Sequence, residues 1–282
     1  MESPHGAAVA AESLGLKGPR GWVFRNVTFS AAPGALVAIE GASGSGRTCL
    51  LLALTGRMRT TEGRAETGGL RLPKQAAAVR TIAALGPVPM VSELDPAFTV
   101  AEHLGERALL QGRYGASLRS LLRPRAERRA AATARVDEAL EAAGLDVAAL
   151  PKAGRTSVRD LERLEALRLS VALALIGKPR LLAVDDTDLK LSDAERDQAW
   201  ALLRSVAAAG TTVLAVCSEA PEDALVVRTD AAGGGQAPGT DDGSADGTAK
   251  ALDETATAPS TDDPTTTTDE ETADAFAETG RS

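Results

Sequence analysis

A glycine-rich stretch near the N-terminus has the residue types and spacing of a phosphate-binding loop. It reads GASGSGRT from Gly41 to Thr48, after an apolar run and before an apolar helix pattern. Closely spaced glycines let the backbone wrap so that successive N–H groups point at phosphate oxygens, and the helix adds its positive N-terminal end. An ordinary glycine-rich turn is the alternative. The flanking patterns favour a phosphate site formed by Gly41, Ala42, Ser43, Gly44, Ser45, Gly46, Arg47, Thr48 and Cys49.

One position of this loop departs from the P-loop pattern G-x-x-x-x-G-K-[ST]. Arg47 stands where the pattern has lysine. The positive charge is kept, but a planar fork replaces a compact ammonium, so pairing with phosphate would take a different geometry. Thr48 supplies the hydroxyl that a Mg²⁺ ion held by the phosphates would use.

A second pattern, RLLAVDD, places two carboxylates directly after an apolar strand. Asp185 is predicted to hold the Mg²⁺ ion together with Thr48, and Asp186 to orient or activate an attacking water. An apolar run that ends in acids is weak evidence alone. Its position far beyond the glycine-rich loop, with a helical stretch between them, makes the pairing more specific.

The elements that must position these residues alternate between strand and helix patterns. Helical patterns cover most of 99–150 and 160–175, and a further helix follows the two aspartates. Such alternation predicts an α/β fold with a parallel sheet covered by helices on both faces. The strands are expected at 22–30, an edge-type strand, at 35–41, at 180–186, and at 211–218, the last buried strand.

Charge is distributed unevenly along the 282 residues. The formal net charge is -8, but residues 230–282 contain 13 acidic and 2 basic residues, so the preceding part is close to neutral. This final segment is rich in Gly, Thr, Asp, Ala and Glu with few apolar residues, which predicts a disordered acidic tail. The 44% of hydrophobic residues supports a sizeable core, built with only 2% aromatics.

Several functional classes are disfavoured by composition. Two cysteines, Cys49 and Cys217, provide neither a disulfide framework nor metal-site spacing, and two histidines argue against histidine-based metal binding. We find no apolar run long enough to span a membrane and no signal-peptide pattern. The sequence therefore predicts a soluble, cytoplasmic protein.

Over about Leu14 to Thr229 the chain resembles the ATP-binding subunit of an ABC transporter. The resemblance is carried, in order, by VFRNVTFSAAPGALVAIEGASGSGRTCLLLALTGRMRTTEG, LGPVPMVSELDPAFTVAEHL, ALALIGKPRLLAVDDTDLKLSDAER and GTTVLAVCSEAPEDA. It implies a P-loop NTPase fold, with an ABC-type RecA-like core, an antiparallel β edge and a helical subdomain insert at about 99–165. Residues 1–13 are then expected to form a flexible N-terminus, 14–229 the ATP-binding domain and 230–282 the tail.

The resemblance also identifies positions where family residues are replaced. Met90 stands at the glutamine of the Q-loop, and the signature motif falls on Leu161–Glu165 with Glu162 at its serine. The catalytic glutamate is shortened to Asp186. Ser192 stands at the aspartate of the D-loop and Ser218 at the switch histidine. The nucleotide-binding positions are thus largely kept, whereas those that sense the terminal phosphate or act across a dimer are replaced.

The resemblance implies ATP and Mg²⁺ as cofactors, and two kinds of partner: a separate multi-span membrane subunit and a second ATP-binding subunit. It places the chain at the inner face of the cell membrane. The replaced motifs imply slow hydrolysis. Two alternatives remain open: a non-hydrolysing nucleotide-binding regulatory module, and the degenerate half of a heterodimeric ABC pair. A soluble ABC protein acting on ribosomes or nucleic acid usually has two cassettes, and this chain has room for one.

Two further features have alternative interpretations. Trp22 is predicted to stack on the adenine ring, as an aromatic residue does near the first strand of this family; a structural aromatic on an edge strand is the alternative. The basic run from Arg119 to Arg129 is interpreted as a solvated helix face, so no nucleic acid is expected as a partner. Cys49 also fits a small core position on the helix that follows the loop.

Overall fold

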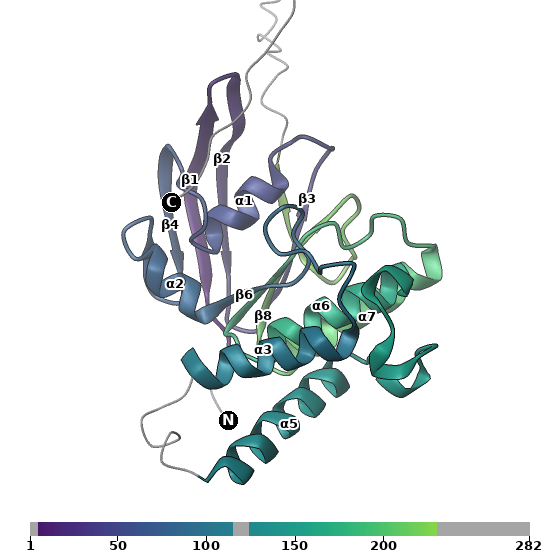
Figure 1. Ribbon diagram of the computed structural model, residues 1–282. Coiled ribbons are helices and arrows are strands. Elements are labelled where there is room, and N and C mark those ends of the chain that lie inside the picture. The colour runs from purple at the N-terminus through teal and green to yellow at the C-terminus, as the bar shows by residue number, and fades with distance from the viewer. Residues whose placement is uncertain (1–4, 115–123, 230–282) are drawn as a thin grey trace, which may run out of the picture. The chain divides into compact units, whose positions relative to one another are not determined.

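The computed structural model describes residues 5–114 and 124–229, which form two β-sheets flanked by helices (Figure 1). The predicted acidic tail and part of the basic run at 119–129 lie outside the described residues. Within those ranges, no helix combines the length and the apolar character needed to cross a membrane.

A five-stranded parallel sheet forms the centre of the fold. Its strand order is β6-β7-β8-β3-β9. The side chains of β7 alternate between two cores: Leu181 and Ala183 belong to one, Leu182 and Val184 to the other. This two-sided burial explains the near-continuous apolar runs. The strands are β3 (Leu36–Glu40), β6 (Ala83–Leu85), β7 (Leu181–Val184), β8 (Thr212–Cys217) and β9 (Leu225–Arg228).

A four-stranded antiparallel sheet provides the second layer, in the order β2-β1-β4-β5. One hydrophobic core joins this sheet to the parallel sheet and to helix α1 (Arg47–Leu54). The predicted strand at 22–30 is β2, at the edge of the sheet as expected. The strands are β1 (Val9–Gly18), β2 (Gly21–Ala31), β4 (Glu62–Thr67) and β5 (Leu70–Leu72), and helix α2 (Ala76–Ile82) follows.

The expected flexible N-terminus, residues 1–13, overlaps an ordered strand. β1 begins at Val9 and pairs with both β2 and β4. Its pairing register shifts between Ala11 and Leu14, and Ser13 has φ 48°. This irregularity breaks the two-residue alternation of buried side chains, so the segment does not look like a strand in the sequence. β1 thus begins five residues before Leu14, where the sequence led us to expect the domain to start.

The strand at 211–218 is not the last one. β9 follows it and pairs in parallel with β3. Only Val227 of its four residues is buried, because β9 lies at the edge of the sheet. A short strand with a single buried side chain has no clear sequence signal.

The remaining helices pack on the other side of the parallel sheet and beyond it (Figure 1). Helices α6 and α7 share the second core with β7 and β8, and α3 and α5 form a third core with α6. Helices α3 and α5 lie within the range predicted as a helical insert. The helices are α3 (Val100–Tyr114), α5 (Arg125–Ala142), α6 (Arg163–Leu175) and α7 (Asp193–Ala208), with 3₁₀ turns at Val147–Ala149, Ala153–Arg155 and Val158–Asp160.

The carboxyl ends of β3, β7 and β8 lie at the same edge, because the three strands are parallel and β8 pairs with both of the others. β3 leads into the glycine-rich loop, β7 into Asp185, and β8 into Ser218. This topology brings the predicted phosphate loop and the predicted metal ligand together.

Candidate nucleotide site

The glycine-rich loop has a conformation that requires its glycines. It joins β3 to α1, and Gly44 and Gly46 have φ of 81° and 86°. A Cβ atom on Gly46 would lie 2.6 Å from the carbonyl oxygen of Val23, and one on Gly41 would lie 2.5 Å from Ser45 Oγ. The loop therefore packs closely on β2 and on itself, as a backbone that wraps a phosphate must.

The floor of the loop is fixed by a buried hydroxyl pair. Ser45 is 1% exposed, and its Oγ lies 2.7 Å from Thr229 Oγ1, just beyond β9. Ala42, Ser43 and Gly44, by contrast, are exposed and form the outer rim of the loop. The predicted binding residues thus divide into an anchored floor and an accessible rim.

Thr48 and Asp185 lie together as predicted. Thr48 Oγ1 donates a hydrogen bond of 2.6 Å to Asp185 Oδ2, and the Asp185 side chain is buried. Burial raises the pKa of this carboxyl, and the neighbouring Asp186 carboxylate raises it further, while the Thr48 hydrogen bond and the Arg47 charge lower it. The ionised form is thus costly without a cation nearby.

This pair of oxygens fits Mg²⁺. The ion prefers hard oxygen ligands and is commonly held by one or two protein groups, with phosphates and water completing the octahedron. Among the described residues no group of three or more His, Cys, Asp or Glu side chains could hold a metal alone. A metal here would therefore depend on phosphate oxygens from a bound nucleotide.

Asp186 lies beside Asp185 in a conformation unusual for aspartate. Its φ is 48°, and its backbone N–H donates to Asp185 Oδ1 at 2.9 Å. Its side chain lines a cavity of about 350 Å³, together with Glu93 and Thr187. Left-handed backbone in a non-glycine residue is uncommon and is found more often at functional sites.

Arg47 contacts the end of a neighbouring strand. Its Nη1 donates a hydrogen bond of 2.5 Å to the carbonyl oxygen of Cys217, the last residue of β8. Arg47, at the lysine position of the P-loop pattern, is thus bonded to the segment in which the family resemblance implies that Ser218 stands at the switch histidine. The sequence alone does not reveal this contact.

Two carboxylates that sequence reasoning missed hold the segment after β8. Asp188 Oδ2 accepts hydrogen bonds from the backbone N–H groups of Ser218 at 2.6 Å and Glu219 at 3.3 Å. Glu40 Oε1 accepts one from Ala220 at 3.3 Å. Both acids follow or end strands of the parallel sheet, so strand topology is the signal that would have identified them.

The other replaced motif positions lie apart from the loop contacts and have local roles. Ser192 is the N-cap of α7, where its Oγ accepts from the backbone N–H of Glu195. Glu162 is the N-cap of α6, and its N–H donates to the Glu165 carboxylate at 2.9 Å. Met90 is 95% exposed in a loop and has φ 61°.

Trp22 lies on β2, one residue before the Val23 carbonyl that the loop approaches. The Arg25 guanidinium lies 4.4 Å from the centre of its ring and the Lys17 ammonium 5.6 Å from it. An adenine ring on the face next to Arg25 would have to displace that side chain, and stacking on Trp22 remains a prediction.

The two cysteines are both shielded. Cys49 is half-buried against the core beneath the loop, and burial followed by the Asp185 charge raises the pKa of its thiol. Cys217 is fully buried, and burial is the main reason that its pKa rises to about 12. Neither thiol is suited to nucleophilic chemistry at neutral pH.

A glycine-rich loop between a parallel strand and a helix, facing an aspartate at the end of a nearby strand, defines a P-loop nucleotide-binding protein. Residues 24–188, more than half of the chain, match the family model for "ABC transporter". The chain belongs to this family, and the part of the family that it represents is the ATP-binding cassette.

Individual relatives agree with this assignment. The chain is 33% identical over 196 residues to "Nod factor export ATP-binding protein I" of Paraburkholderia xenovorans (strain LB400), covering 68% of this chain and 56% of the relative. A protein of the same name from Rhizobium johnstonii is 29% identical over 218 residues, with 76% and 63% covered. The chain therefore spans somewhat more than half the length of the curated relatives that it matches.

Solved structures share the fold. A dimeric bacterial ABC transporter cassette superimposes with a TM-score of 0.61 at 19% identity, covering 79% of this chain and 96% of that one. A bacterial Atm1-family ABC exporter with ATP bound gives a TM-score of 0.59 at 23% identity, covering 82% and 38%.

Proposed function

We propose that this chain binds ATP and Mg²⁺ in its glycine-rich loop and couples that binding to a separate membrane subunit, with slow hydrolysis. The observation that carries the proposal is the preserved pair of Thr48 and Asp185 beside the glycine-rich loop. Asp185 is buried with an ionisation cost that a cation would relieve. The exporter with ATP bound provides support by analogy of fold.

In this proposal each group of site residues binds a different part of the nucleotide or its metal ion. Backbone N–H groups of the loop from Gly41 to Cys49 bind phosphate oxygens, and Trp22 contacts the base. Thr48 and Asp185 hold Mg²⁺, which would neutralise phosphate charge. Asp186 orients water at the terminal phosphate. Because an aspartate is shorter than the family's glutamate, and the other sensing positions are replaced, turnover is slow.

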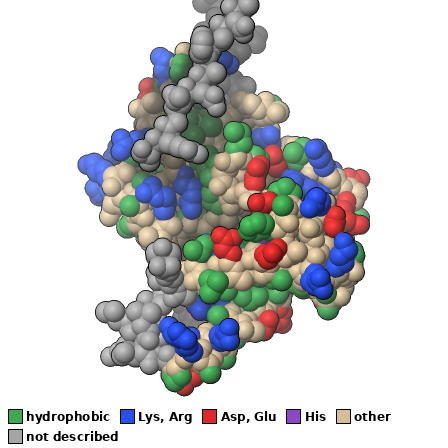
Figure 2. Space-filling view, in the orientation of Figure 1, with side chains coloured by type: hydrophobic (Ala, Val, Ile, Leu, Met, Phe, Trp, Pro, Cys, Tyr) green, Lys and Arg blue, Asp and Glu red, His purple; other side chains and the backbone are tan. Residues whose placement is uncertain are grey.

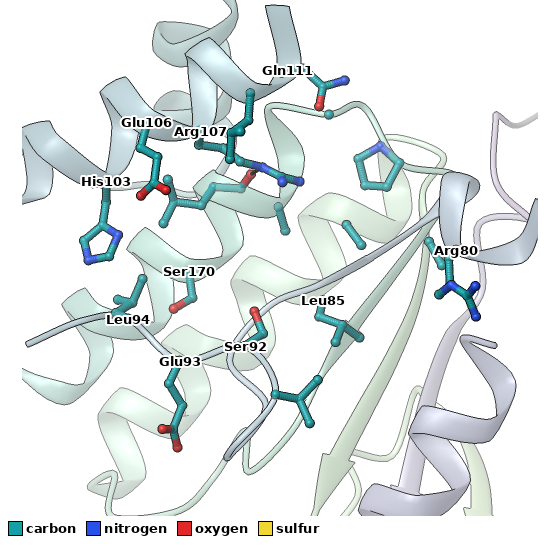
Figure 3. A pocket seen from close by; sticks show the side chains of 18 of the residues that line it. Arg80, Leu85, Ser92, Glu93, Leu94, His103, Glu106, Arg107, Gln111 and Ser170 are labelled. Carbon is teal, nitrogen blue, oxygen red and sulfur yellow. Dashed lines mark hydrogen bonds between the residues drawn. The ribbon is translucent and has the colours of Figure 1, made fainter. Parts of the chain in front are cut away.

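A groove on the helical side suits the membrane partner. It has a volume of about 540 Å³ and lies between β6, the loop at Val91–Leu94, α3 and α6 (Figure 3). Figure 3 shows His103, Glu106, Arg107 and Gln111 of α3 along one wall. Val91 and Leu110 also line the groove and are 51% and 42% exposed. The lining of the groove is mostly polar, and these two exposed apolar side chains lie within it. Exposed apolar side chains among polar ones can contribute the buried contacts of a docked partner.

One end of this groove is cationic. Arg57 donates to the carbonyls of Thr55 and Ala83, and Arg80 to that of Gly56, and neither takes part in an ion pair among the described residues. Burial and the Arg80 charge lower the pKa of Arg57. Lys and Arg side chains gather over the nearby β4 and α2 region (Figure 2). An acidic residue on the docked segment would neutralise this end.

The proposal places the chain in the cytoplasm, peripheral to the inner face of the membrane, with a second ATP-binding subunit beside it. The names of the relatives refer to Nod factor export. The cargo is not inferred from those names, because the membrane subunit would choose it.

A non-hydrolysing regulatory module, or the degenerate half of a heterodimeric pair, is the second candidate. Two observations favour it. Arg47 is bonded to Cys217 rather than free in the loop, and the Glu165 carboxylate accepts the N–H of Glu162 at the start of α6. The negative charge of these carboxylates at the start of α6 would repel the terminal phosphate of a nucleotide bound to a second subunit.

Steady-state phosphate release from Mg·ATP separates the two candidates. We expect a low rate that falls at least about tenfold in Asp186→Asn, since loss of a catalytic base typically reduces rates by 10²- to 10⁴-fold. If the two proteins release phosphate at the same background rate, hydrolysis is excluded and the regulatory module is the better assignment.

A further inference from the structure

The segment Cys217–Ala220, here called the switch segment, is held by three charged side chains. Arg47 Nη1 donates to the Cys217 carbonyl at 2.5 Å. Asp188 Oδ2 accepts from the N–H groups of Ser218 and Glu219 at 2.6 Å and 3.3 Å, and Glu40 Oε1 from that of Ala220 at 3.3 Å. The switch segment contains no histidine, and these three side chains hold it through its backbone groups.

Of these three side chains, only that of Arg47 belongs to the phosphate loop. Arg47 is the first residue of α1, between Gly46 and Thr48. A phosphate in the loop would lie next to this guanidinium. The bond from Arg47 to the Cys217 carbonyl is charge-assisted on the donor side only. A phosphate adds a negative charge on the acceptor side and can accept two parallel N–H bonds from the guanidinium, so it competes favourably with the carbonyl for this side chain. Pairing with a phosphate also reorients the planar fork as a unit.

We propose that Arg47 is a two-position latch that couples nucleotide binding to release of the switch segment. Without nucleotide it holds the Cys217 carbonyl. With nucleotide it turns to the phosphates, and the switch segment loses its link to the P-loop. This inference rests on the proposed nucleotide binding. It assigns to the lysine replacement a signalling role in addition to binding.

The neighbouring contacts limit how far the release can extend. Arg204 of α7 holds Asp223 with two hydrogen bonds, of 2.6 Å and 2.9 Å. On the other side, β8 is buried along its whole length and paired with β3 and β7. The released region therefore lies between Cys217 and Asp223, and its amides at Ser218, Glu219 and Ala220 report on it.

Amide hydrogen exchange of the full chain, measured by mass spectrometry with and without Mg·ATP, tests the latch. We expect exchange in the switch segment to rise on the order of tenfold with nucleotide, because a charged hydrogen bond is lost. Exchange in β3 serves as the internal control and stays unchanged. Unchanged or slower exchange would mean that Arg47 keeps the carbonyl or bridges it to the phosphate, and would overturn the proposal.

Two variants make the test independent of nucleotide affinity. In Arg47→Met the switch segment should exchange about tenfold faster than in the parent protein even without nucleotide. If the exchange rate is the same in both proteins, the Arg47–Cys217 hydrogen bond does not stabilise the switch segment, and the proposal is wrong. In Asp188→Asn one tether is weakened but the latch remains, so the basal rate rises and the response to nucleotide persists; loss of that response would contradict the assignment to Arg47.

Calorimetry on the same samples separates the two proposals. If ATP binds but hydrogen exchange in the switch segment does not change, the latch proposal is wrong and the proposed function still stands. Absence of ATP binding overturns both.

Discussion

At the residue scale, Asp185 connects the stability of the chain to its proposed metal site. It is buried, accepts hydrogen bonds from Thr48 and from the Asp186 backbone, and has a pKa raised mainly by burial. A carboxyl whose folded pKa is raised binds its proton more tightly in the folded state. Stability is therefore lost as pH rises from the unfolded pKa through the folded one, and the loss is complete above it.

Asp185→Asn should therefore stabilise the protein in the absence of nucleotide and metal. The amide removes the ionisation cost. Its single oxygen can still accept from the Asp186 N–H, and its NH2 group can donate to the Thr48 hydroxyl, whose hydrogen rotates freely. We expect a gain of about 1 kcal/mol at neutral pH, or roughly 2–4 °C in Tm for a domain of this size, measured by differential scanning calorimetry. The gain should shrink at acidic pH, where Asp185 itself is protonated. A lower Tm at neutral pH would show that the charged form stabilises the fold.

Residue types and spacing predicted the loop from Gly41 to Thr48 and its meeting with Asp185, because a strand, a glycine-rich turn and a helix constrain each other locally. The contacts of Arg47 with Cys217 and of Asp188 with Ser218 were not predictable in this way. They join residues far apart in the sequence, and their geometry depends on the register of three parallel strands.

At the element scale, buried strands and long helices were predictable and marginal strands were not. β7 and β8 are continuous apolar runs because both faces are buried. β1 and β9 were missed for different reasons: β1 contains a register shift near Ser13, and β9 buries only Val227. In both cases tertiary pairing determines the strand, and local sequence carries little of that information.

Two replaced motif positions have become helix caps. Ser192 forms a capping box with Glu195 at the start of α7, and Glu162 is the N-cap of α6. Serine is among the preferred N-cap residues, and its hydroxyl here fulfils that local role. The family resemblance implies that these positions have lost residues that sense the terminal phosphate or act across a dimer, whereas the structure shows their place at the helix starts.

Helix α3 offers a matched pair of variants for the docking groove. Leu110 lines the groove, whereas the adjacent Leu109 is 77% exposed and does not. We expect Leu110→Glu to reduce the share of the chain that sediments with cell membranes at least about threefold, because a buried unpaired charge at an interface costs on the order of 2 kcal/mol or more. Leu109→Glu should behave like the parent protein. Equal effects of the two changes would argue against docking in the groove.

At the scale of the whole molecule, the chain has the fold of an ATP-binding cassette. Thr48 lies beside Asp185 at the end of the glycine-rich loop, and we propose that this pair holds the magnesium ion of a bound nucleotide. The resemblance to the family implies that the switch and signature positions are replaced. The fold follows from the family match over residues 24–188 and from the sheet topology. For this chain we therefore propose that nucleotide binding and nucleotide hydrolysis are to be measured separately, because the first does not guarantee the second.

Calorimetric titration of the full chain with ATP, with and without Mg²⁺, tests the central claim most directly. The proposed function predicts saturable binding with a Kd below about 1 mM in the presence of Mg²⁺, which corresponds to about 4 kcal/mol. It also predicts weaker binding when the ion is removed, since Asp185 then faces the phosphates without a cation. No binding of Mg·ATP at millimolar concentration would contradict the claim that this loop is a nucleotide site.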